Sequence, residues 1–96
     1  MIDFKRNARV VCKDGFSLSV QASEFSYCTP RITGAPRYTE AEVGFPSNKE
    51  PLLMPYIDGG DLSPTENVYG WVPAEVIQRV IQKHGGRVSG DLPRGI

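Results

Sequence analysis

The chain is 96 residues long, which leaves room for one hydrophobic core and therefore for a single domain. Hydrophobic residues make up 40% of it and charged residues 23%, a globular composition that excludes wholesale disorder. Its 11 basic and 11 acidic residues cancel, so the chain lacks the positive charge with which proteins bind duplex nucleic acid non-specifically.

The N-terminal residues do not have the pattern of a secretory signal. Charged residues recur from Asp3 to Arg9, where a signal peptide needs an apolar core. No apolar run approaches the roughly 20 residues that span a bilayer. We therefore expect a soluble cytoplasmic protein with no membrane partner, in which Cys12 and Cys28 are free thiols that act as small hydrophobes.

The first predicted element is a β-hairpin over Ala8–Ala22. Strand-forming residues stand on both sides of Asp14-Gly15, a dipeptide that favours a type I′ turn. Apolar and polar residues alternate from Phe16 to Ala22, so one face of that strand should lie on the core. After a bulge the strand is expected to continue towards Thr29.

The middle of the chain alternates between turns and strands. Residues Arg31–Arg37 are predicted to form a turn-rich connection, and Tyr38–Phe45 a strand with Ala41, Val43 and Phe45 on one face. The next segment, Ser47–Tyr56, has the capping spacing of a short helical turn.

A loop follows at Asp58–Asn67, and Val68–Val72 returns to strand character. Simple alternation places Tyr69 and Trp71 together on one face of this last strand, opposite Val68 and Val72.

An amphipathic helix is predicted from Pro73 to His84, with Gly85-Gly86 as its end. Its apolar stripe consists of Val76, Ile77, Val80, Ile81 and His84. We therefore predict an α+β fold: a small antiparallel β-sheet of about four strands with one amphipathic C-terminal helix packed on it. Residues 1–86 form the domain, and residues 87–96 are expected to be a flexible C-terminal tail.

No pattern in the sequence is typical of a catalytic centre, a metal site or a bound cofactor. The only histidine, His84, lies at a helix end whose dipole favours the imidazolium, which suits a cap better than a general base. The cysteines and this histidine match no zinc spacing, and no glycine-rich phosphate loop occurs. The sequence thus predicts a protein that is not an enzyme, with no catalytic residues, metal or cofactor.

Two groups of residues are candidates for binding. Tyr27 and Arg31 precede the turn-rich connection and Arg37 and Tyr38 follow it, so guanidinium groups and aromatic rings would form a rim that holds an anion or a nucleotide. In the alternative interpretation, the two tyrosines form a cross-strand pair and the arginines solvate a loop.

Tyr69 and Trp71 form the second group. Exposed aromatics of this kind are enriched in the hot spots of protein interfaces. The alternative is that Trp71 is buried in the core or in a dimer interface.

Four runs carry a resemblance to a known family: Asp14–Ala22, Tyr27–Arg31, Glu42–Ser47 and Tyr69–Pro73. Across roughly Ala8–Gly86 the chain resembles a family of small uncharacterised bacteriophage proteins. The resemblance implies a context, the cytoplasm of the host cell, rather than an activity. Small phage accessory proteins often act by binding, for example by blocking a host defence complex or capturing a signalling nucleotide.

We therefore expect a non-enzymatic phage accessory protein that binds and modulates or inhibits a host protein, such as a component of a defence system. The alternative is a binder of a small anionic ligand, a sponge for a signalling nucleotide. A sheet this small also gains stability by pairing its edge or face with a second copy, which favours a homo-oligomer.

Overall fold

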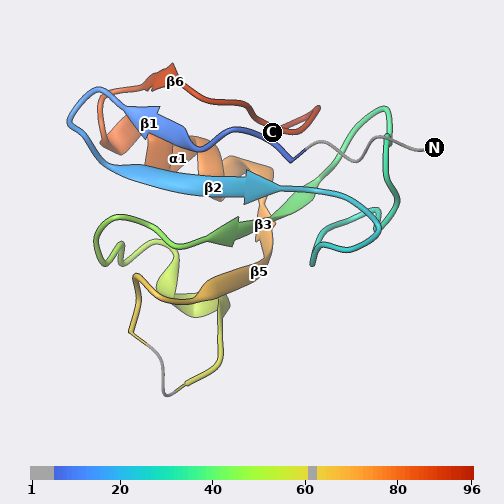
Figure 1. Cartoon of the computed structure of the whole chain (residues 1–96), viewed down its shortest axis with the longest axis horizontal. Helices are drawn as coiled ribbons and strands as arrows, with labels where there is room; N and C mark the ends of the chain where they lie inside the picture. Colours follow the sequence, from blue (N-terminus) through green and yellow to red (C-terminus); the bar gives the residue numbers. More distant parts are fainter. Residues whose placement is uncertain (1–5, 61–62) are drawn as a thin grey trace.

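The computed structural model describes residues 6–60 and 63–96, so positions 1–5 of the predicted domain and 61–62 of the predicted loop lie outside the described residues. An antiparallel sheet of six strands, in the order β4-β5-β3-β2-β1-β6, carries one α-helix near the C-terminal end (Figure 1). The strands are β1 (Val10–Cys12), β2 (Ser17–Gln21), β3 (Glu40–Gly44), β4 (Ile57–Asp58), β5 (Val68–Pro73) and β6 (Arg87–Ser89). The predicted α+β class is confirmed.

The hairpin of β1 and β2 is confirmed, but its turn differs from the predicted type. Val10 pairs with Leu18, and the Gly15 N–H donates to the Cys12 carbonyl over 3.0 Å. Of the two turn residues, only Gly15 has a positive φ, 95°. The loop therefore has three residues and ends on a left-handed glycine, a common hairpin alternative to the type I′ turn.

Two short strands, β4 and β6, were not predicted from the sequence pattern. The expected number of about four strands is therefore wrong, since the sheet has six. The two residues of β4 and the three of β6 are too few to show any alternation. β4 pairs with β5, and β6 pairs with β1 across a register shift. Together they form the two edges of the sheet.

The helix α1 (Ala74–Lys83) begins directly after Pro73, which is the last residue of β5. Its buried residues are Ile77, Val80 and Ile81, as the predicted stripe requires. In Figure 1 the helix lies behind β1 and β2. The core consists of the inward side chains of the helix and the central strands, among them Val10, Leu18, Val20, Ala41, Val43, Tyr69, Val72, Ile77 and Val80.

Residues 87–96 are part of the fold, contrary to the predicted tail. Besides β6, this segment provides Ile96, which is 8% exposed and accepts a hydrogen bond from the Gln78 amide over 2.9 Å. The Asp91 N–H also donates to the carbonyl of Ala8 over 3.0 Å. These contacts are long-range and carry no periodic signature, so the sequence pattern does not reveal them.

Elsewhere, the predicted helical turn is the short 3-10 helix η1 (Met54–Tyr56). Residues Ser23–Thr29 do not continue β2 but form a connection whose Thr29 makes one bridge to Glu40. Within the described ranges, no helix combines the length and apolar character that crossing a bilayer requires.

Candidate functional site

The most distinctive exposed feature is an aromatic stack between β5 and the connection after β2. The rings of Tyr27 and Trp71 are stacked with centroids 4.8 Å apart and planes 21° apart, and the Arg31 guanidinium carbon lies 5.4 Å from the Tyr27 centroid. Trp71 remains 47% exposed. The stack thus presents an indole, a phenol ring and a guanidinium to the solvent.

A β-bulge places Trp71 in this position. Ala41 pairs with Val72 and Val43 with Tyr69, so both Gly70 and Trp71 stand opposite the single residue between them on β3, Glu42. The extra residue reverses the alternation, which sends Tyr69 into the core and leaves Trp71 outside. The prediction that these two aromatics share one face is therefore wrong.

The backbone at Trp71 is strained. Its φ is 49°, in the left-handed region that costs an ordinary L-residue about 1–2 kcal/mol. The Trp71 N–H donates to the Tyr27 carbonyl over 3.0 Å, and stacked aromatic pairs contribute roughly 0.5–1.5 kcal/mol beyond their burial. These interactions offset the strain, so an exposed tryptophan is held in an unfavourable conformation by contacts to Tyr27.

Tyr27 covers the backbone beside the stack. A Cβ atom built on Gly70 would lie 3.4 Å from the Tyr27 Cβ, which is a close but ordinary contact. The Tyr27 N–H donates to Glu42 Oε1 over 3.3 Å, so Glu42 borders the stack. We call the group of Trp71, Tyr27, Arg31 and Glu42 the Trp71 surface.

Two of the predicted site residues are structural instead. Tyr38 is 4% exposed, and its hydroxyl donates to the Ile32 carbonyl over 2.6 Å and accepts from the Ala35 N–H. Tyr69 is fully buried, and its hydroxyl donates to the Pro64 carbonyl over 2.6 Å. Each ring therefore anchors a loop to the core, and neither is available to a ligand.

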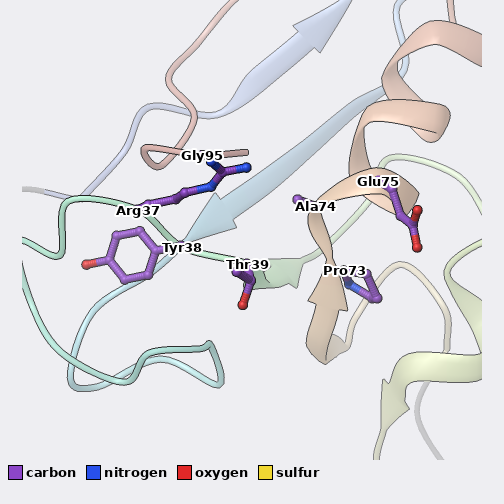
Figure 2. Close-up of a pocket in the computed structure, with 7 residues that line it drawn as sticks. All are labelled: Arg37, Tyr38, Thr39, Pro73, Ala74, Glu75 and Gly95. Carbon is purple, nitrogen blue, oxygen red and sulfur yellow. The ribbon is translucent and has the colours of Figure 1, made fainter.

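Arg37 lies at a different place from Arg31. It lines a hollow of about 210 Å³ at the start of α1, together with Thr39, Pro73 and Glu75 (Figure 2). Figure 2 shows Arg37 and Glu75 on opposite sides of this hollow, while the Tyr38 ring points away from it. Because the hollow is lined by one carboxylate as well as one guanidinium, it offers no net positive charge to an anion.

His84 joins the end of α1 to the hairpin turn. Its Nδ1 lies 2.7 Å from an Asp14 carboxylate oxygen, its Nε2 lies 2.8 Å from Glu50 Oε1, and its ring stacks on Phe16 at 3.9 Å. The Glu50 side chain is 1% exposed and is also paired with Lys83 at 2.9 Å. With both ring nitrogens bound to carboxylates, the imidazolium is the form that satisfies every contact.

The titration of this cluster follows from its contacts. Partial burial opposes the charged form of His84, but the hydrogen bonds and charges of Asp14 and Glu50 outweigh it and raise the pKa of the imidazole. Burial likewise opposes the charge of Glu50, yet the Leu52 N–H and the two cations hold the pKa of this carboxyl below its ordinary value. A histidine held in this way acts as a structural cation rather than a base.

The remaining reactive groups do not assemble into a site. Cys12 and Cys28 are free and each is 2% exposed, and burial is the main cause that raises the pKa of both thiols. Among residues 6–60 and 63–96, no three side chains of histidine, cysteine, aspartate or glutamate are grouped as metal ligands would be.

The structure thus brings together Tyr27, Arg31 and Trp71, and separates them from Arg37. The predicted four-residue rim is not assembled, because one tyrosine is buried and the second arginine lies on another hollow. Sequence reasoning missed Glu42, whose alternation with buried Ala41 and Val43 marks it only as an outward residue.

No protein-family model matches the chain, and neither the curated proteins nor the solved structures include one that matches it.

Proposed function

We propose that the protein is a non-enzymatic binding module that attaches to a host protein through the Trp71 surface. The resemblance to small phage proteins supplies the context, in which blocking a host component, such as part of a defence system, is the expected mode of action. The observation that carries the proposal is the half-exposed Trp71, held at a φ of 49° and stacked on Tyr27.

Strained residues persist only where the surrounding structure enforces them, and they cluster at functional positions. Tryptophan, tyrosine and arginine are also the residues most enriched in interface hot spots. Here one of each lies in a single stack, and Trp71 is held in place because its ring stacks on Tyr27 and its backbone N–H donates to the Tyr27 carbonyl. Such preorganisation lowers the entropy lost on binding a partner.

The test compares two aromatic residues of matched geometry. Trp71 and Phe45 are 47% and 49% exposed, with φ values of 49° and 48°, but only Trp71 belongs to the stack. Asparagine tolerates the left-handed region, so Trp71→Asn and Phe45→Asn remove each ring with little change to the backbone.

Immobilised wild-type protein and both variants would be exposed to extract of infected host cells. A protein captured in stoichiometric amount would then be purified and titrated against all three by calorimetry. We expect Trp71→Asn to weaken the affinity roughly 30-fold or more, as loss of a hot spot of about 2 kcal/mol does. Equal affinities of Trp71→Asn and Phe45→Asn would exclude the Trp71 surface as the binding site.

Capture of a small anionic ligand is the second candidate, because an indole face lies near the Arg31 guanidinium, which forms no ion pair with a described residue. Together they combine a stacking plane with an anion partner. The structure separates Arg31 from Arg37, so the two arginines serve as variant and control. If purified protein retains a nucleotide by mass spectrometry, and Arg31→Ala releases it while Arg37→Ala does not, this function replaces the first.

A further inference from the structure

The Trp71 surface carries charges that form no ion pair with the residues the structure describes. Arg31 lies over the Tyr27 ring and forms no ion pair with any carboxylate in the described part of the chain. Glu42 and Glu40, on β3, each accept one hydrogen bond but form no ion pair with a described residue, although Arg6 lines the same hollow as Glu42. One cation and one carboxylate therefore belong to the Trp71 surface, and the second carboxylate, Glu40, lies two residues from Glu42 on β3.

This arrangement is complementary to itself. In an interface with two-fold symmetry the same patch lies on both copies, so a residue i that contacts j is matched by j contacting i. A two-fold axis through the Trp71 surface would set Arg31 of each copy against Glu42 of the other. A partner surface of a single charge sign could form ion pairs with Arg31 or with the carboxylates, but not with both. The charge pattern therefore favours a second copy of the chain.

The molecule is broad enough for such a contact. Seen down the shortest axis, as in Figure 1, the molecule extends 36 × 31 Å. Specific interfaces bury about 800 Å² on each partner.

We propose that the Trp71 surface is a two-fold dimer interface, in which Arg31 of each copy pairs with Glu42 of the other and the two Trp71 indoles are buried between them. The inference rests on the proposed function, which identifies the Trp71 surface as the binding site, and it adds that dimerisation regulates this site. Since the host protein and the second copy use the same residues, each excludes the other. The dimer is therefore the form of the binding module that does not bind the host protein.

Charge reversal with mixing tests the pairing. Arg31→Glu alone and Glu42→Arg alone each oppose like charges across the interface, so each variant is expected to dimerise at least roughly tenfold more weakly than wild type. An equimolar mixture of the two variants must recover a dimer, because every carboxylate of the first variant then faces a guanidinium of the second. If Glu42→Arg fails to fold, Glu40→Arg takes its place.

Sedimentation velocity over a range of concentrations gives the readout, against a monomer mass of 10.6 kDa. Trp71 is the only tryptophan, so a blue shift of its emission with concentration reports its burial directly. Trp71→Asn should be monomeric and the matched control Phe45→Asn dimeric. A wild type that stays monomeric, or variants that fail to complement each other on mixing, would overturn the proposal.

The two proposals fail separately. A monomeric wild type whose captured partner is lost in Trp71→Asn keeps the binding function and rejects the dimer. A dimer disrupted by Trp71→Asn, with no stoichiometric partner in infected extract, keeps the dimer and rejects host binding.

Discussion

Replacement of Glu50 by glutamine tests how the fold is held together at its hairpin end. The carboxylate is 1% exposed and binds Lys83 at 2.9 Å, His84 at 2.8 Å and the Leu52 N–H at 2.8 Å. Glutamine keeps the shape and removes the charge, which leaves two cations without their shared anion.

The expected loss is about 2 kcal/mol. Breaking a buried ion pair by removing one partner typically costs about 3–5 kcal/mol. Here the Lys83 side chain is 48% exposed and regains hydration, whereas His84, at 17%, does not, so the loss falls below that range. For a domain of this size, about 2 kcal/mol lowers the Tm by roughly 8–16 °C.

The stability should also depend on pH in a defined direction. Because the pKa of His84 is raised from 6.5, its contribution is complete below pH 6.5 and is lost as the pH rises through the higher native pKa. The pKa values of Glu50 and Asp14 are lowered, so their contributions are present above pH 4.5 and 3.8, respectively, and are lost as the pH falls through the native values. Stability is therefore greatest between these limits.

Urea denaturation followed by circular dichroism, at pH 6 and at pH 9, measures both effects. Glu50→Gln should lower the free energy of unfolding at pH 6 and reduce the difference between the two pH values, because His84 loses one of its two anions. Glu66→Gln, in an exposed loop, is the control and should stay within about 0.5 kcal/mol of wild type. A Glu50→Gln protein with wild-type stability and an unchanged pH slope would refute the role assigned to this cluster.

Three further substitutions or probes test other parts of the structure. A Cβ on Gly90 would lie 2.2 Å from the Arg9 carbonyl oxygen, so Gly90→Ala should lower the free energy of unfolding in urea by roughly 2 kcal/mol or more; an unchanged value would show that residues 87–96 are not packed as described. Cys12 and Cys28 are each 2% exposed, so Ellman's reagent should react with them orders of magnitude faster after denaturation than before. Trp71→Gly relieves the strain at φ 49° but loses the stack, so the free energy of unfolding should change by less than about 1 kcal/mol. Trp71→Val keeps the strain and also loses the stack, so it should lower the free energy of unfolding by about 2 kcal/mol in the same assay.

The elements that sequence reasoning predicts well are the ones specified locally. The hairpin is encoded by Asp14-Gly15 between two strands, and the helix by its apolar stripe, by Pro73 before it and by glycines after it. Each signal lies within a window of about a dozen residues. The strands β4 and β6 lack such a signal because they exist only through pairing with a neighbour.

The candidate site was predicted only in part, because its residue types can be recognised locally but their arrangement depends on strand pairing. Tyr27, Arg31 and Trp71 are residue types suited to binding, so composition alone selects them. Their meeting depends on the bulge at Gly70-Trp71, which shifts the register between β3 and β5 and turns Tyr69 inwards. A bulge is a property of two paired strands, so alternation read along one strand assigns these aromatics to the wrong faces.

The fold separates the residues that stabilise it from those that form the Trp71 surface. Figure 1 places the hairpin turn and the connection that contains Tyr27 beyond opposite ends of β2, a strand of five residues or about 17 Å. At the turn, His84 and Glu50 are fully engaged with each other and with their neighbours. At the other end, Arg31 is left unpaired by the described residues and Trp71 is strained. A domain of this size has little stability to spare, so the ionic cluster around buried Glu50 offsets the cost of the strained backbone at Trp71.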